Sequence, residues 1–163
     1  MNNQEILDEI NKTEEHLANM KKMLAECEYK RWEPVKDETY YYVYSNLEVH
    51  ADSNYNTLND MKRIKVYNCF RTKKQAEKEA EKILVRRMLE DIARRLNKGE
   101  KADYNRSQKK YYLFWNAELD ELKQKHLYWT RTQGVVYCLS ESFIDVAIQE
   151  IGKERLKKYL RGE

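Results

Sequence analysis

Residues 72–99 read TKKQAEKEAEKILVRRMLEDIARRLNKG and predict one long helix. Thr72 is followed three residues later by Gln75, a capping-box pattern in which each side chain can bond the other residue's backbone N–H. Apolar side chains then recur at helical spacing up to Gly99. At 1.5 Å per residue, roughly 25 residues span about 37 Å. We therefore expect this helix to cross a whole sheet.

Short strands are predicted on the N-terminal side of this helix. Thr39–Tyr44 is rich in aromatic residues, which favours a strand, and a turn at Ser45-Asn46 leads into an antiparallel return strand over Leu47–Ala51. A polar loop, residues 52–60, follows. Polar and apolar residues alternate over Arg63–Tyr67, which predicts a third strand whose inward residues are Ile64 and Val66.

The C-terminal half repeats this plan. We expect a strand over 111–115, a polar stretch over 116–125, and two more strands over 126–131 and 135–139 that are joined by a turn at Gln133-Gly134. A helix capped by Ser140 should follow, and its inner face should carry Ile144, Ile148 and Ile151. Two pseudo-repeats, at about 32–99 and 108–152, would give an α+β domain of antiparallel strands with helices on one sheet face. Coincidence is the alternative, because capped helices after strands are common. Gly152 should separate this part from a short helix over 153–161.

The first 31 residues predict a coiled-coil helix that makes the protein a homo-oligomer. A 3.5-residue repeat keeps one seam facing a partner helix. Its seam positions with an oligomerisation role are Ile6, Ile10, Leu17, Met20 and Leu24, with Asn3, Thr13 and Cys27 in the same seam. An amphipathic helix that folds back on its own domain is the alternative. Trp32-Glu33-Pro34 ends the helix, because a residue before proline avoids the α region, so the α+β binding domain covers 32–163.

Charge is distributed unevenly along the chain. The net charge is +3, but residues 1–30 hold 4 Lys against 7 Asp or Glu, while residues 31–163 hold 27 Lys or Arg against 21 Asp or Glu. A mildly basic domain favours anionic partners, such as nucleotides, nucleic acid or an acidic protein surface. No apolar run is long enough for a membrane span and the N-terminus lacks a signal-peptide pattern, so we expect no membrane contact and a cytoplasmic location.

Residues with catalytic or metal-binding chemistry do not cluster in this sequence. Its three cysteines, Cys27, Cys69 and Cys138, lack metal-ligand spacing and favour reduced core residues. Neither His16, His50 nor His126 has a neighbouring Ser or Cys nucleophile, and four scattered glycines form no phosphate-binding loop. We therefore expect a protein that is not an enzyme and uses no cofactor or metal.

Aromatic residues interleaved with Arg and Lys carry the binding prediction. Such a surface can stack bases and pair phosphates. Because side chains alternate along a strand, Tyr40, Tyr42 and Tyr44 share one face, and one face of each strand must be core. The residues expected to bind a ligand are Arg31, Trp32, Tyr40, Tyr42, Arg63, Tyr112, Trp129 and Arg131.

Several stretches resemble a module of small accessory proteins from bacteriophages and mobile elements of Firmicutes. The resemblance rests on Trp32-Glu-Pro34, on Tyr40-Tyr41 and on Asn68-Cys-Phe-Arg-Thr72 before an Ala/Glu-rich helix. The ending over 147–156, AIQEIGKERL, is similar to the module's C-terminal pattern, so the likeness covers nearly the whole chain. A departure lies at Lys36-Asp37, where the module has a glycine in the turn.

This resemblance implies a role in interaction with the host, because small early phage proteins of this kind are often anti-defence factors. The leading hypothesis is a non-catalytic phage anti-defence protein that acts by binding in the host cytoplasm. It would be an oligomeric sponge for a nucleotide-derived immune signal, or an inhibitor docking on a host defence protein such as a CRISPR nuclease. The alternatives are a nucleic-acid-binding regulator, using Lys73–Lys98 along a phosphate backbone, and a purely structural scaffold.

Overall fold

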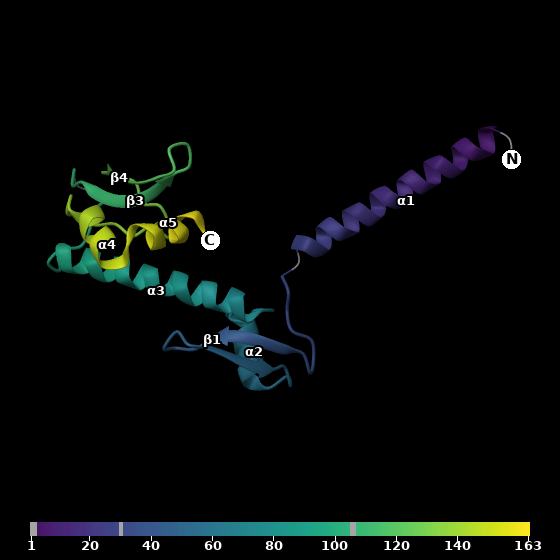
Figure 1. The fold of residues 1–163 in the computed structure, drawn as a ribbon, viewed down its shortest axis with the longest axis horizontal. Helices are drawn as coiled ribbons and strands as arrows, with labels where there is room; N and C mark the ends of the chain where they lie inside the picture. Colours follow the sequence, from purple (N-terminus) through teal and green to yellow (C-terminus); the bar gives the residue numbers. More distant parts are fainter. Residues whose placement is uncertain (1–2, 30, 105–106) are drawn as a thin grey trace.

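A computed structural model describes residues 3–29, 31–104 and 107–163, and within the first helix the side chains of 6, 7 and 9–23. The fold is mixed α+β, as predicted (Figure 1). In chain order its elements are α1 (Asn3–Tyr29), β1 (Thr39–Val43), β2 (Val49–Ser53), α2 (Leu58–Lys65), α3 (Lys73–Leu96), β3 (Lys110–Asn116), β4 (Glu121–Leu127), α4 (Phe143–Ile151) and α5 (Lys153–Arg161).

The N-terminal helix α1 lies apart from the other elements (Figure 1). All of its described side chains are exposed, including the seam residues Ile6, Ile10, Leu17 and Met20. Thr13, a polar seam position, donates its hydroxyl to the Glu9 carbonyl at 2.8 Å, so this hydroxyl has a hydrogen-bond partner within the helix. The side chains of Asn3, Leu24 and Cys27 lie outside those that the structure describes.

The first hairpin, β1–β2, forms as predicted around the Ser45-Asn46 turn, although β2 begins two residues later than expected. Tyr41 faces Ala51 and Tyr42 faces His50 across the antiparallel pair. Tyr41 and Val43 pack with Ala76 and Ala80 of α3. They share this core-facing side of β1, as expected from the alternation of side chains along a strand. Alanine at both helix positions lets the hairpin approach the helix closely.

The strand predicted over Arg63–Tyr67 is wrong, because these residues form the end of α2 and the turn after it. Thr57 and Asp60 form a capping box that starts the helix inside the predicted polar loop. Val66 then caps the C-terminal end, and Tyr67 has a φ of +64° that stops further helix. The local alternation of polar and apolar residues fits one helical turn equally well.

The long helix α3 begins as predicted, with the complete capping box of Thr72 and Gln75. Its first half contributes Ala76 and Ala80 to the first hairpin. Its second half contributes Val85, Leu89 and Ile92 to the larger core, which holds the second hairpin, α4 and α5. One helix therefore connects two hydrophobic clusters.

The second hairpin differs from the prediction in its return strand. β3 matches the expected strand, but β4 covers Glu121–Leu127, which lies mostly in the predicted polar stretch. The predicted strands over 126–131 and 135–139 are wrong except for the end of β4 and an isolated bridge between Tyr111 and Cys138. β4 is rich in charged residues because much of it remains exposed, with Leu122 as its buried residue. The turn at Gln133-Gly134 is present.

The last two helices close the larger core. α4 begins at Phe143 rather than directly after Ser140, whose hydroxyl accepts from the Ser142 N–H at 3.3 Å inside the preceding turn. Its buried positions are Phe143, Ala147 and Ile151, so the predicted inner face was offset, with Ile151 common to both. Gly152 has a φ of +93° and separates α4 from α5, as the sequence predicts.

The strands do not form the single sheet that α3 was expected to cross. The described strands make two separate two-stranded sheets: β1–β2 packs on the first half of α3, and β3–β4 lies on the other side of α4 and α5 from its second half (Figure 1). In the first unit, Tyr41 of β1 forms a β-bridge with Phe70, two residues before Thr72. In the second unit, Tyr111 of β3 forms a β-bridge with Cys138, two residues before Ser140. The two units thus share an order of hairpin, bridging segment and helix. A helix of 24 residues, about 36 Å long, keeps the two hairpins apart.

Candidate functional site

An open depression beside the start of α3 combines aromatic rings with cationic side chains. We call it the basic recess. Its volume is about 560 Å3. Its cations are Arg31, Arg71, Lys78 and Lys82, its rings are Trp32, Tyr67 and Phe70, and Cys69, Gln75 and Glu79 complete the lining.

Arg31 is positioned by two contacts inside the recess. Its Nη2 donates to the Ile64 carbonyl at 2.7 Å, and its guanidinium lies 3.8 Å from the centroid of the Tyr67 ring. Tyr67 remains 72% exposed, so the ring is open to a second stacking partner. Arg31 therefore orients Tyr67 and adds positive charge beside it.

The segment between α2 and α3 is held against β1, which fixes the rings of the recess. The side chain of Asn68 bonds both the N–H and the carbonyl of Val43, at 2.8 Å each. Phe70 exchanges backbone hydrogen bonds with Tyr41 at 2.8 and 2.9 Å. This segment acts as a short third strand, which places Cys69 and Phe70 next to the helix start.

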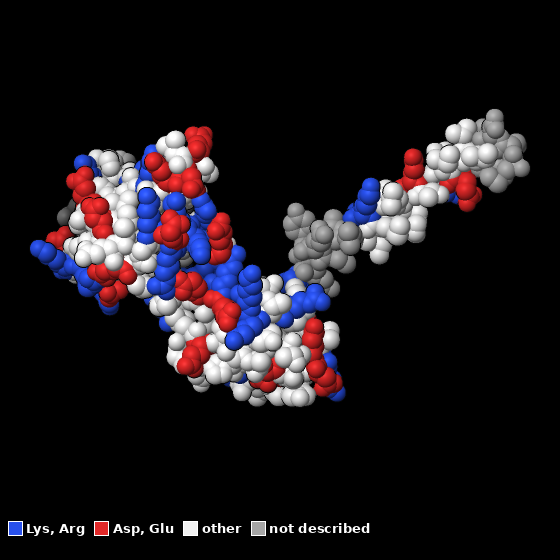
Figure 2. All heavy atoms as spheres, viewed as in Figure 1, with Lys and Arg blue, Asp and Glu red and all other residues white. Residues whose placement is uncertain are grey.

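Positive charge dominates the recess. Among the described residues that line it, Glu79 is the one acid, against four cations. Lys78 and Lys82 are four residues apart on α3 and so lie on the same helix face. The N-terminal end of α3 adds its own partial positive charge. Figure 2 shows Lys and Arg side chains gathered over the first half of α3, with some acidic residues among them.

Cys69 contributes a thiol to the recess that is poorly suited to nucleophilic attack. It is buried, and burial raises its pKa to about 11, so the thiolate is scarce at neutral pH. Cys138 is also a free, buried thiol. Both match the prediction of reduced core residues.

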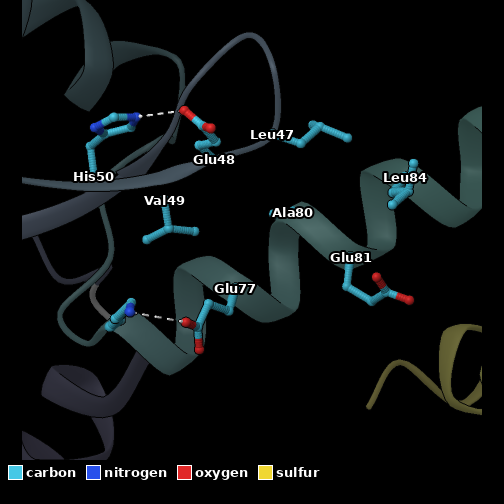
Figure 3. Close-up of a pocket in the computed structure, with 9 residues that line it drawn as sticks. Leu47, Glu48, Val49, His50, Glu77, Ala80, Glu81 and Leu84 are labelled. Carbon is cyan, nitrogen blue, oxygen red and sulfur yellow. Dashed lines mark ion pairs between the residues drawn. The ribbon is translucent and has the colours of Figure 1, made fainter.

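A second depression, the hairpin groove, lies on another side of α3 and has the opposite charge character. It has a volume of about 480 Å3, and Figure 3 shows Leu47 and Val49 of the hairpin across from Ala80 and Leu84 of α3. Its acidic residues are Glu48, Glu77 and Glu81. Glu48 lies 3.4 Å from His50 and Glu77 lies 3.5 Å from Lys73. These carboxylates make the groove unfavourable for an anionic ligand.

Two residues predicted to bind a ligand instead hold the first unit together. Tyr40 is fully buried and donates its hydroxyl to Asp60 at 2.7 Å. The Nη1 atom of Arg63 donates to Asp52 at 2.6 Å and to the Tyr40 oxygen at 2.7 Å. Arg63 also lies 3.6 Å from the centroid of the Tyr42 ring. Ligand binding by Tyr40 and Arg63 stays a prediction, which the burial of Tyr40 and the internal partners of Arg63 disfavour.

The other predicted binding residues do not form one site. Arg31 and Trp32 line the basic recess. Tyr112, Trp129 and Arg131 belong to the second unit, beside the other half of α3. Tyr112 packs at 5.9 Å from Tyr137, and Trp129 is 61% exposed beside Tyr128. The aromatic-basic pattern of the sequence therefore divides over two surfaces.

Sequence reasoning missed most of the recess. The sequence places Lys78 and Lys82 in a generally basic helix, Arg71 in the segment before that helix, and Tyr67 at the end of a predicted strand. The spacing of Gln75, Lys78 and Lys82 on one helix face could have identified the wall, but the opposing rings come from segments 31–32 and 67–70. Only tertiary structure brings these together.

Comparison with known proteins gives no match to a family model, to a curated protein or to a solved structure. None of the described helices is long and apolar enough to cross a membrane. Within the described part of the chain, no group of three or more His, Cys, Asp and Glu residues is placed to hold a metal ion.

Proposed function

We propose that this chain is a non-catalytic binding protein that captures a nucleotide-derived ligand in the basic recess. The observation that supports this most directly is the combination of three rings and four cations around one open depression of about 560 Å3. A nucleotide presents a flat base and anionic phosphates to such a surface. Its base would stack on the exposed Tyr67 ring.

The phosphates would pair with the cations on the α3 side of the recess. Arg71 can form a bidentate contact with phosphate, and Lys78 and Lys82 can add two point charges. Arg31 is held by the Ile64 carbonyl and by Tyr67, so it would support the stacking ring. Binding changes no covalent bond, and the ligand should be recovered intact after denaturation.

The resemblance to phage accessory proteins gives this activity a biological setting. In that setting the protein would act in the host cytoplasm as an anti-defence sponge for a nucleotide-derived immune signal. The exposed seam of α1, including Ile10 and Leu17, supports homo-oligomerisation, which would multiply the number of recesses per particle. Oligomer formation and phage origin both belong to the proposal.

The proposal is tested by calorimetry with cyclic nucleotides and ADP-ribose derivatives on the full chain. At least one of these ligands should bind, and Arg71→Ala or the pair Lys78→Gln and Lys82→Gln should weaken it about tenfold or more. Lys73→Gln is the matched control, because Lys73 lies on the same helix but lines the hairpin groove. If no nucleotide binds, or if Lys73→Gln weakens binding as much as the pair Lys78→Gln and Lys82→Gln, the proposal fails.

A second candidate is an inhibitor that docks on a host defence protein. Large apolar side chains around α2 favour it, since Leu58 is 72% exposed and Met61 51%. Tyr55 and Val66 at the two ends of this helix are also exposed. Pull-down from host lysate should then recover a defined partner that Leu58→Lys loses and Arg71→Ala retains. The opposite pattern would favour the recess as the binding surface.

A further inference from the structure

The two hairpins can be superimposed residue by residue through their bridges. Tyr41 bridges Phe70 on the free edge of β1, and Tyr111 bridges Cys138 on the free edge of β3. Taking Tyr41 and Tyr111 as equivalent makes Tyr42 equivalent to Tyr112, and makes Tyr44 equivalent to Phe114. The outer face of each hairpin, meaning the face that carries these rings, can then be compared directly.

α2 packs on part of the outer face of the first hairpin. Arg63 of α2 lies over the Tyr42 ring at 3.6 Å, and Tyr40 beside it is fully buried. The second hairpin has no helix in this place, because residues 128–142, all of which the structure describes, contain none; Tyr137 of this segment packs on Tyr112 at 5.9 Å. Tyr112 and Phe114 are both partly exposed, and their ring centroids are 6.2 Å apart.

Cationic side chains surround these two rings. Lys125 lies opposite Tyr112 in the hairpin register, and its Nζ is 4.5 Å from the Phe114 centroid. Lys123 lies opposite Phe114, where Glu121 contacts it at 3.0 Å. Arg131 is exposed and lies 5.9 Å from the ring of Tyr104, which packs on Tyr137, the ring that contacts Tyr112. The face thus offers flat rings bordered by positive charge.

We propose that the outer face of the β3–β4 hairpin binds single-stranded nucleic acid. Successive bases would stack on Tyr112 and Phe114, and the backbone phosphates would pair with Lys125 and Arg131. A duplex keeps its base faces stacked internally and cannot use these rings. The site is separate from the basic recess, so it is independent of the proposed nucleotide capture.

Fluorescence anisotropy with a labelled dT12 oligonucleotide and the full chain tests this inference. Phe114→Ala should weaken binding about tenfold, because stacking on an aromatic side chain contributes that much per base. Tyr44→Ala is the matched control, since Tyr44 is the equivalent residue of the first hairpin and is 53% exposed. Lys125→Gln, a change at an exposed side chain, should reduce the slope of log affinity against log salt by about 0.7.

Each of these measurements has a result that would contradict binding of single-stranded nucleic acid to this face. Absence of dT12 binding in about 50 mM salt, equal binding of a duplex of the same length, or equal loss in Phe114→Ala and Tyr44→Ala overturns the inference. Phe114→Leu should keep the fold and still lose affinity, which separates stacking from packing. Arg71→Ala should leave dT12 binding unchanged while it weakens mononucleotide binding. The reverse result would place the oligonucleotide in the recess and overturn this assignment.

Discussion

The hydroxyl of Tyr40 donates to the carboxylate of Asp60 at 2.7 Å, and this bond joins the outer face of β1 to the first turn of α2. Asp60 is 2% exposed and also accepts from the N–H groups of Tyr55 and Thr57. Arg63 donates to the same Tyr40 oxygen and ties it to Asp52. One small network therefore holds the helix against the hairpin.

Tyr40→Phe should destabilise the protein by about 1–3 kcal/mol, because it leaves Asp60 and Arg63 each with one fewer partner in a buried place. Urea denaturation followed by circular dichroism measures the change. Tyr44→Phe is the matched control on the same strand face and should shift the free energy of unfolding by less than about 0.5 kcal/mol. Equal effects of the two changes would show that the network adds nothing to stability.

Asp60 should also make stability depend on acid. Burial acts to raise its pKa, but hydrogen bonds from Tyr40 and Thr57 outweigh burial and hold the pKa below its usual range. A carboxyl whose pKa is lower in the folded state stabilises the fold above its unfolded value, about 3.9, and loses this contribution as pH falls through the folded value. The free energy of unfolding should therefore begin to fall below about pH 4.

Asp60→Asn should be less stable at pH 7 by about 1–3 kcal/mol, because a buried carboxylate that accepts from Tyr40, Tyr55 and Thr57 is replaced by an amide, while Arg63 keeps its ion pair with Asp52. Its stability should fall less steeply than that of the native chain as pH drops from 5 to 3. Glu81 also has a lowered pKa, through hydrogen bonds from Arg155, so Glu81→Gln serves as the comparison for a more exposed carboxylate. Parallel pH profiles for Asp60→Asn and the native protein would contradict the assignment.

Backbone conformation at Asp37 gives a third prediction. Asp37 has a φ of +66° in the turn before β1. A residue with a Cβ is strained in this region, and glycine is not. Asp37→Gly should stabilise the protein by about 0.5–1 kcal/mol, measured as a higher urea midpoint. Lys36→Gly, at the neighbouring position without a positive φ, should instead destabilise by a similar amount, and stabilisation by both would refute the argument.

Much of the fold could be predicted because local signals decide it. Thr72 with Gln75 started α3, the aromatic run over 39–44 marked β1, and Gly152 separated the last helices. α2 was missed because its capping box uses Asp60, which the sequence also presents as a loop residue. β4 was missed because a hairpin strand with one face in solvent needs few apolar residues.

The candidate site was harder to predict, since it depends on contacts between distant segments. Arg63 and Tyr40 have the residue types of a stacking site. However, the Tyr40 hydroxyl donates to Asp60, twenty residues away, and Arg63 in turn donates to the Tyr40 oxygen. Arg31 and Trp32, which line the recess, could be singled out from the sequence because charge and ring are adjacent in it. The place of Lys78 and Lys82 in the recess could not be predicted without knowing which face of α3 meets the segment over 67–70.

The exposed seam of α1 leads to the prediction with the largest measurable effect. Ile10 is 47% exposed and Leu17 is 46% exposed within a single chain, although both repeat at the spacing of a coiled coil. An isolated helix of this length is marginal in water, so its apolar seam should be buried by other copies. Ile10→Asp with Leu17→Asp should reduce the mass from light scattering to that of one chain and lower the helical signal at 222 nm.

Asn11→Asp with Ala18→Asp is the matched control for the seam. It introduces the same two charges at the same seven-residue spacing, one position away from the seam, on side chains that are also exposed. This variant should keep the oligomeric mass, since positions outside the seam do not enter the interface. If the seam variant also keeps it, the oligomer forms elsewhere. If the native chain is already a monomer, α1 must have another partner.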